Sequence, residues 1–248
     1  MANWNDPQPT RQGFGAAPGL NPSVPSTRAG FDAGLRKYML SIYNYMASGV
    51  LLSGIVAIVM ANTAFGVGII TSPLMWLIVL SPLAIVFAMS FGANRFSQGT
   101  LQILFWAFAT LMGMSMSTIF LVYTGESIAA TFFATAGAFA GLSLFGYTTK
   151  KDLSGFGSFL IMGVIGLIIA SVINLFLQSS ALYWAISFLG VLIFAGLTAY
   201  DTQRLKAQYY HLAGTDFIGK AVILGALSLY LDFINMFQFL LAFMGQRD

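Results

Sequence analysis

Asp232 is the residue of this chain most able to do chemistry, because it lies in the middle of the apolar stretch GALSLYLDFINMFQFLL, residues 225–241. Residues three and four apart on a helix share a face, so Ser228, Asp232 and Asn235 form one polar stripe. A carboxylate at the centre of a membrane helix costs roughly 2.5–3.5 kcal/mol on insertion scales and usually marks a pathway or a proton relay. The stripe therefore predicts a helix that turns Asp232 toward partner groups or water.

Two other charged residues lie at the edges of apolar stretches. Asp201, in GLTAYDTQRLK, lies near the end of the sixth stretch, and Arg95, in FGANRFSQGT, lies at the end of the second. Two aspartates could form a protease dyad, but neither follows a glycine, as it would in the Gly-Asp motifs of aspartyl membrane proteases. An arginine so close to an apolar boundary needs a partner, so we expect Arg95 to approach Asp201 or to reach the lipid phosphates.

The other residue types that could take part in catalysis argue against an enzyme. The chain has no cysteine, which excludes disulfides, thiolate catalysis and cysteine metal sites. The single histidine, His211, lies in a predicted loop and so cannot activate an intramembrane serine, and Lys220 lies at a helix boundary rather than at a Schiff-base position. We expect no catalysis and no cofactor. Two interpretations remain, an ion or proton pathway and a purely structural role in which the aspartates join helices.

Composition indicates an integral membrane protein. Of the 248 residues, 58% are hydrophobic and 8% are charged, whereas soluble domains carry about 25% charged residues. The apolar runs are continuous and about twenty residues long, enough for helices that cross about 30 Å of hydrocarbon, and they lack the alternation of a transmembrane barrel. The net charge of +3 does not indicate nucleic acid as a partner, because the basic residues are dispersed singly or in pairs.

The pattern predicts two regions and an all-α membrane fold. Residues 1–37 are rich in Pro, Gly, Asn and Ser and predict a disordered tail, followed by a transmembrane domain over residues 38–248. The seven predicted spans are 39–61, 72–93, 101–123, 127–147, 157–177, 182–203 and 220–244. The polar stripe on the seventh suggests that this helix is central and that the other six surround it.

The basic residues predict the orientation, because short cytoplasmic loops carry an excess of Lys and Arg. Ten of the eleven fall on one side of the predicted membrane: Arg11, Arg28, Arg36, Lys37, Arg95, Lys150, Lys151, Arg204, Lys206 and Lys220. Arg247 falls on the other side. We therefore expect a cytoplasmic amino terminus and an external carboxyl terminus, which an odd number of spans requires.

Three segments together resemble the Bax inhibitor family, the transmembrane Bax inhibitor motif proteins and their bacterial relatives. They are GLTAYDTQRLK, GALSLYLDFINMFQFLL and the linker FGYTTKKDLSGFGSFL, residues 145–160. The resemblance covers roughly residues 30–245 and implies six helices around a central carboxyl-terminal one, in a bacterial inner membrane. It also implies a pH-sensitive calcium leak, in which calcium is the permeant ion.

The resemblance assigns roles to particular residues. It implies that Asp201 and Asp232 form a hydrogen-bonded pair that senses pH and contacts Ca²⁺ transiently, and that Arg95 pairs with Asp201 when the pathway is closed. Some relatives carry a glutamate in the second helix, but LSPLAIVFAMSFGAN has no acidic residue. Ionising both of two carboxylates in one low-dielectric site costs much free energy, so the two should titrate as a pair.

Two expectations remain open. If the seventh span begins near Lys220, Asp232 lies about 18 Å inside it, whereas Asp201 lies near the predicted end of the sixth. The two meet if the sixth helix continues through TQRLKAQYY, as we expect, or if a cytoplasmic cavity reaches them. The second expectation concerns function, because bacterial relatives also modulate a membrane-anchored AAA protease, for which residues 1–30 would be a natural handle.

Overall fold

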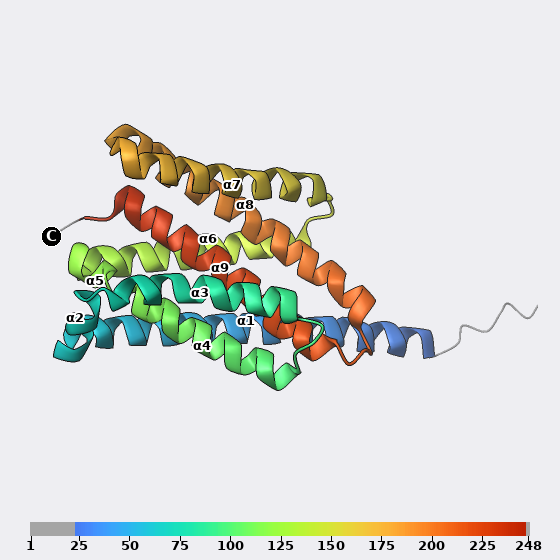
Figure 1. Cartoon of the computed structure of the whole chain (residues 1–248). Helices are drawn as coiled ribbons and strands as arrows, with labels where there is room; N and C mark the ends of the chain where they lie inside the picture. Colours follow the sequence, from blue (N-terminus) through green and yellow to red (C-terminus); the bar gives the residue numbers. More distant parts are fainter. Residues whose placement is uncertain (1–22, 247–248) are drawn as a thin grey trace, which may run out of the picture.

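The computed structural model describes residues 23–246, with side chains from residue 32 onward, and all regular structure in that part of the chain is helical (Figure 1). The helices are α1 (Ser23–Asn62), α2 (Ala64–Ile70), α3 (Leu74–Gly92), α4 (Gln98–Met116), α5 (Ile119–Val122), α6 (Gly125–Thr148), α7 (Ser154–Leu177), α8 (Ser180–Leu212) and α9 (Ile218–Met244). Seven of the described segments are long and apolar enough to cross a membrane, with α5 continuing the α4 span. The predicted all-α fold with seven spans is confirmed.

The main differences from the predicted spans lie at two helix ends. α1 begins at Ser23 rather than near residue 38, and Leu35 and Tyr38 in its first part are buried. Residues 1–22 lie outside the described part, so a disordered tail there stays a prediction. α8 continues to Leu212, well past the predicted end at residue 203. The expectation that this helix extends through TQRLKAQYY is confirmed.

The spans form two groups of three, with α9 between them (Figure 1). In one group α4 packs against both α1 and α3, and in the other α8 packs against both α6 and α7. α9 contacts α1, α4, α6 and α8. Half of the most apolar stretch of α9 is buried, against a third or less in every other span. The carboxyl-terminal helix is therefore central, as predicted, although α3 and α7 lie farther out.

Small and polar residues allow the helices to approach closely. A Cβ atom added at Gly146 would meet the backbone of Ala199, and one added at Gly113 would meet the backbone of Ser53. Small residues at such crossings are typical of membrane helix packing. The hydroxyl oxygen of Ser53 lies 2.6 Å from the carbonyl oxygen of Ala109 and 2.6 Å from the phenol oxygen of Tyr230. This contact joins α1, α4 and α9 and holds α9 against one group of helices.

Backbone groups inside the spans find local partners, as a membrane interior requires. Pro82 lies inside α3 and has no N–H to donate to the carbonyl of Ile78. The hydroxyl of Ser81 donates to that carbonyl at 2.8 Å instead. Side-chain caps begin α4 and α8, where the hydroxyls of Ser97 and Ser179 accept backbone N–H groups.

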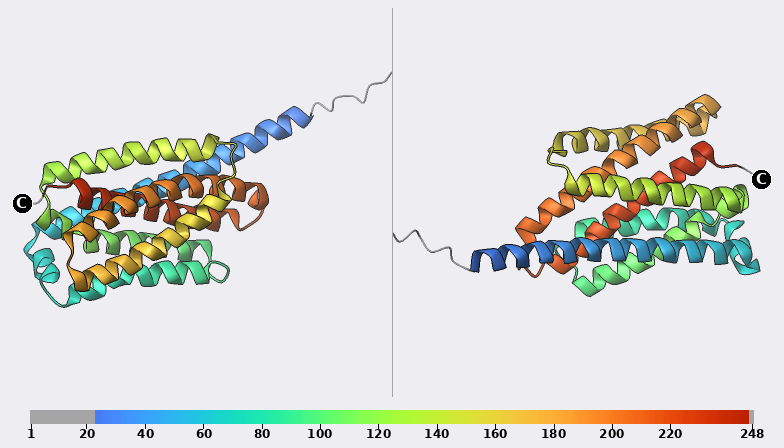
Figure 2. Two further views of the ribbon diagram at one scale, coloured as in Figure 1. Left: turned by 90° about the horizontal axis from the view of Figure 1, so that it is seen from above. Right: turned by 180° about the vertical axis from the view of Figure 1, so that it is seen from behind.

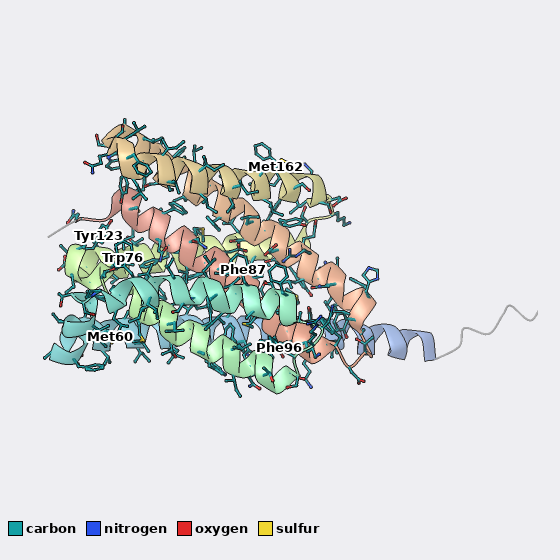
Figure 3. All side chains as sticks on the ribbon, in the orientation of Figure 1. Met60, Trp76, Phe87, Phe96, Tyr123 and Met162 are labelled. Atoms are coloured by element: carbon teal, nitrogen blue, oxygen red, sulfur yellow. The ribbon has the colours of Figure 1, made fainter. Side chains whose placement is uncertain are left out.

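Large apolar side chains cover the outside of the bundle (Figure 3). Trp76 and Phe87 on α3 and Met162 on α7 are all at least half exposed and project outward. A soluble protein rarely exposes so much contiguous apolar surface. The exposed surface therefore fits a lipid bilayer as the surrounding medium.

Candidate functional site: an acidic pair between α8 and α9

Helix geometry determines which residues of α8 and α9 meet. The short α8–α9 loop joins Leu212, the last residue of α8, to Ile218, the first residue of α9. Along the axis of α8, Asp201 lies about 16 Å from Leu212, and along the axis of α9, Ser228 lies about 15 Å from Ile218. Asp232 lies about 21 Å from Ile218, one turn deeper. Since α8 and α9 pack along each other, Asp201 comes level with Ser228 rather than with Asp232.

The contacts of Asp201 follow from this register. The hydroxyl of Ser228 donates a hydrogen bond to the Oδ2 atom of Asp201. The guanidinium of Arg204, one turn further along α8, lies 3.2 Å from the same oxygen and donates to Ser228 Oγ at 3.0 Å. Asp201 is only 6% exposed, whereas the Arg204 side chain is 44% exposed. A buried carboxylate is thus joined to solvent-accessible space through one arginine, and the three side chains fasten α8 to α9.

Asp232 lies deeper in the bundle and is almost fully buried. It is 5% exposed, and its Oδ2 atom has no hydrogen-bond partner among the described residues. The charged groups close enough to act on it electrostatically are Asp201 and Arg204. Leaving a carboxylate buried without a donor is costly, so Asp232 is the most unusual polar group in this part of the molecule.

The structure brings Asp201 and Asp232 onto facing helices. Ser228 and Arg204 both contact the Oδ2 atom of Asp201, since the one-turn difference in depth places Ser228 opposite Asp201. The hydrogen bond and the shared proton between the two carboxyls that the resemblance implies stay predictions.

Arg95 does not reach Asp201 in this structure. It lies in the turn between α3 and α4, where its backbone N–H donates to the carbonyl of Gly92, and its side chain is exposed. The cation at Asp201 is Arg204, which was considered above only as one of the basic residues that predict the orientation. Once α8 is extended, the Asp201–Arg204 pair has the i,i+3 spacing of a helical ion pair. That spacing is the feature of the sequence that could have identified Arg204 as the partner of Asp201. A gating role for Arg95 stays a prediction.

Ser228 and Asn235, the other members of the predicted stripe, line two different cavities. A cavity of about 280 Å³ beside α3 is lined by Ser228 and Arg204. A second, of about 590 Å³, lies between α3, α7 and α9 and is lined by Asn235, whose amide donates to the carbonyl of Leu231. Val86 and Leu231 line both cavities. The cavity near the acidic pair and the one farther along α9 therefore adjoin at these two apolar side chains.

The loop between α6 and α7 is fastened to the same end of α8. The side chain of Gln203 accepts from the Leu153 N–H at 2.9 Å and donates to the Lys151 carbonyl at 2.8 Å. In this loop the hydroxyl and backbone N–H of Ser154 lower the pKa of the Asp152 carboxyl. Asp152 thus remains ionised at neutral pH next to Lys151. These contacts join the α6–α7 loop to α8 two residues beyond Asp201.

Seven apolar helices around two buried carboxylates define a multi-pass membrane protein with an acidic site inside the bundle. Comparison with protein families matches residues 35–248 to the family described as "Inhibitor of apoptosis-promoting Bax1". The chain therefore belongs to the Bax inhibitor family, as the resemblance indicated.

Several similar proteins come from bacteria. An uncharacterised protein of Caulobacter vibrioides is 50% identical over 241 residues, covering 90% of this chain and 94% of that protein. The inner membrane protein YbhL of Escherichia coli K12 is 46% identical over 219 residues, covering 87% of this chain and 94% of that protein. An uncharacterised protein of Rickettsia prowazekii is 49% identical over 228 residues, covering 88% and 92%. Similarity of this extent makes the chain a multi-pass protein of the inner membrane.

Proposed function

We propose that this protein is a pH-sensitive cation leak of the inner membrane, with calcium as a permeant ion, rather than an enzyme. The observation that carries the proposal is the buried acidic pair, in which the Oδ2 atom of Asp232 has no hydrogen-bond partner among the described residues and the neighbouring Asp201 is bonded to Arg204 and Ser228. If the two aspartates only joined helices, each carboxylate should have hydrogen-bond donors. Polar contacts inside membranes contribute on average under about 1 kcal/mol, which is too little to justify burying a carboxylate that lacks a donor. Intramembrane ionisable residues more often mark a pathway or a proton relay.

In this proposal Asp201, Arg204 and Ser228 form a latch between α8 and α9. The ionised Asp201 holds Arg204 and Ser228, so the three side chains keep the two helices together. Protonation of Asp201 removes the ion pair and weakens the hydrogen bond to its oxygen. Acidification should therefore loosen the latch and raise the flux. Because Asp232 lies beside Asp201, the two carboxyls titrate as one unit.

The route we propose runs along the α3 face of α9. It begins in the cavity lined by Arg204 and Ser228 and continues into the cavity lined by Asn235. Val86 and Leu231, which line both cavities, would form the apolar barrier of this route. Loosening of α8 from α9 would allow α9 to shift relative to α3 and open this barrier.

Calcium suits such a route as a passing ion. Ca²⁺ takes six to eight oxygen ligands, and two carboxylates with Ser228 and Asn235 supply only part of that number. Water would complete the shell at each step. We therefore propose that Asp201 and Asp232 contact the ion briefly and draw it toward the barrier by their negative charge.

Flux into liposomes tests the proposal. Purified protein is reconstituted with a calcium indicator inside the liposomes, and the initial rate is measured from pH 5 to pH 8 with protein-free liposomes as the control. We expect a calcium flux above the control that rises as the pH falls. A rate equal to that of protein-free liposomes at every pH would contradict a leak.

A further inference from the structure

A groove separates α1 from α6 on the outer surface of the bundle. Both helices pack against α8 and α9 rather than against each other, and they run alongside one another in the right-hand view of Figure 2. Near the amino-terminal side, the groove widens into a cavity of about 500 Å³. Its lining includes Arg36, Leu40 and Tyr43 of α1 and Ala140, Leu144 and Tyr147 of α6.

One cation lines the entrance to this groove, and a second contacts a residue that lines it. Arg36 lines it from α1, is exposed and pairs with no acidic side chain among the described residues. On the α6 side, the ammonium of Lys206 donates to the carbonyl of Tyr147 at 2.7 Å and lies 4.7 Å from the centre of that ring. Asp32 lies one turn before Arg36 on α1 and lines a neighbouring cavity with it, but it is not within ion-pair distance of Arg36 and does not line the groove. The entrance therefore carries one exposed cation, Arg36, with Lys206 beside Tyr147, next to a largely apolar lining.

The dimensions of the groove fit one leaflet. Arg36 and Tyr43 are seven residues apart, about 10 Å along the helix, within the roughly 15 Å of hydrocarbon that one leaflet supplies. Tyr43 and Tyr147 are partly buried at its edge, as is common for tyrosines near a membrane interface. Farther along the same two helices, a second cavity of about 360 Å³ has an apolar lining that includes Ile128 and Phe132.

We propose that the α1–α6 groove binds an anionic phospholipid from the leaflet on the amino-terminal side, with its phosphate at Arg36 and Lys206 and one acyl chain between the helices. Basic pockets between membrane helices recognise anionic headgroups, and the apolar lining below the two cations suits an acyl chain. A zwitterionic lipid would fill the groove but would not neutralise both cations. The proposal is independent of ion conduction.

Lipid retention by the purified protein tests the proposal. Protein in a neutral detergent is equilibrated with phosphatidylglycerol or phosphatidylcholine, and bound lipid is counted by native mass spectrometry. We expect preferential retention of phosphatidylglycerol and about fivefold weaker retention in Arg36→Gln, the loss expected for one interfacial cation. Lys37→Gln is the matched control, because Lys37 lies next in sequence but outside the groove, and its retention should stay within twofold of the unsubstituted protein. Equal retention of the two lipids, or equal losses in the two variants, would overturn the proposal.

Crosslinking identifies the occupant directly. Ala140 is exposed and lines the groove, whereas Ala138 is exposed but does not. With benzoylphenylalanine at position 140, illumination of membranes should add the mass of one phospholipid, and the same probe at position 138 should add far less. Ala140→Phe should also expel the lipid without altering Arg36, whereas Ala138→Phe should not. A crosslink from position 140 to residues 1–22 or to a second copy of the chain would overturn the lipid assignment.

Discussion

Double-mutant cycles on calcium flux can identify which arginine holds Asp201. In the structure Arg204 makes both the ion pair at 3.2 Å and the hydrogen bond to Ser228 at 3.0 Å. Its side chain is 44% exposed, so solvent screens the pair, and a value of about 1 kcal/mol, at the upper end for exposed pairs, is appropriate. If that energy favours the closed state, breaking the latch should raise the open population about fivefold.

Arg204→Gln should therefore raise the flux at pH 7.5 by about fivefold, and Asp201→Asn should do so by a similar factor. The double variant should be no more active than either single variant, because both substitutions break the same latch. The matched cycle uses Arg95→Gln with Asp201→Asn, and its effects should be additive. Flux is measured in liposomes at equal protein content. Coupling of Asp201 to Arg95 together with additivity for Arg204 would refute the latch and restore Arg95 as the gating partner.

Three other predictions concern the barrier, the topology and the tail. Leu231→Ser should raise calcium flux at every pH, because it places a hydroxyl at the apolar barrier. Leu83 lines only the larger cavity, so Leu83→Ser should leave the flux unchanged. Equal effects of the two substitutions would contradict the route. A reporter fused after Gln246 should report an external location, since ten of the eleven basic residues lie on the opposite side; a cytoplasmic signal would contradict the orientation. Deletion of residues 2–22 should leave the flux unchanged but remove any binding to a membrane-anchored AAA protease; loss of flux would assign the tail to conduction.

The spans could be predicted from the sequence because membrane helices need about twenty apolar residues each. Their ends could not be predicted as well. The segment TQRLKAQYY is polar, so hydropathy ends the sixth span before it, yet α8 continues to Leu212 because Leu205 and Tyr209 pack into the core. Likewise, α1 begins before residue 38 because Leu35 is buried. Tertiary packing determines both ends.

The candidate site could be predicted in its members but not in its contacts. The polar positions 228, 232 and 235 stand out in an apolar stretch, and the register between α8 and α9 then decides which of them meets Asp201. That register depends on the α8–α9 loop and on packing between helices distant in sequence. Arg204 was missed although the helix was expected to continue through TQRLKAQYY, because the i,i+3 spacing permits an ion pair with Asp201 but does not require one. The cavities on either side of Leu231 depend on α3 and α7, which no local pattern places.

The pH profile of calcium flux in Asp232→Asn tests the central claim most directly. The substitution keeps the shape of the side chain but removes its titration, and Asp216→Asn, at an exposed aspartate just before α9, is the matched control. In liposomes between pH 5 and pH 8, the unsubstituted protein and Asp216→Asn should show flux that rises as the pH falls. The flux of Asp232→Asn should be nearly independent of pH, whereas an unchanged rate and profile would make Asp232 a packing residue and contradict the proposed acidic pair.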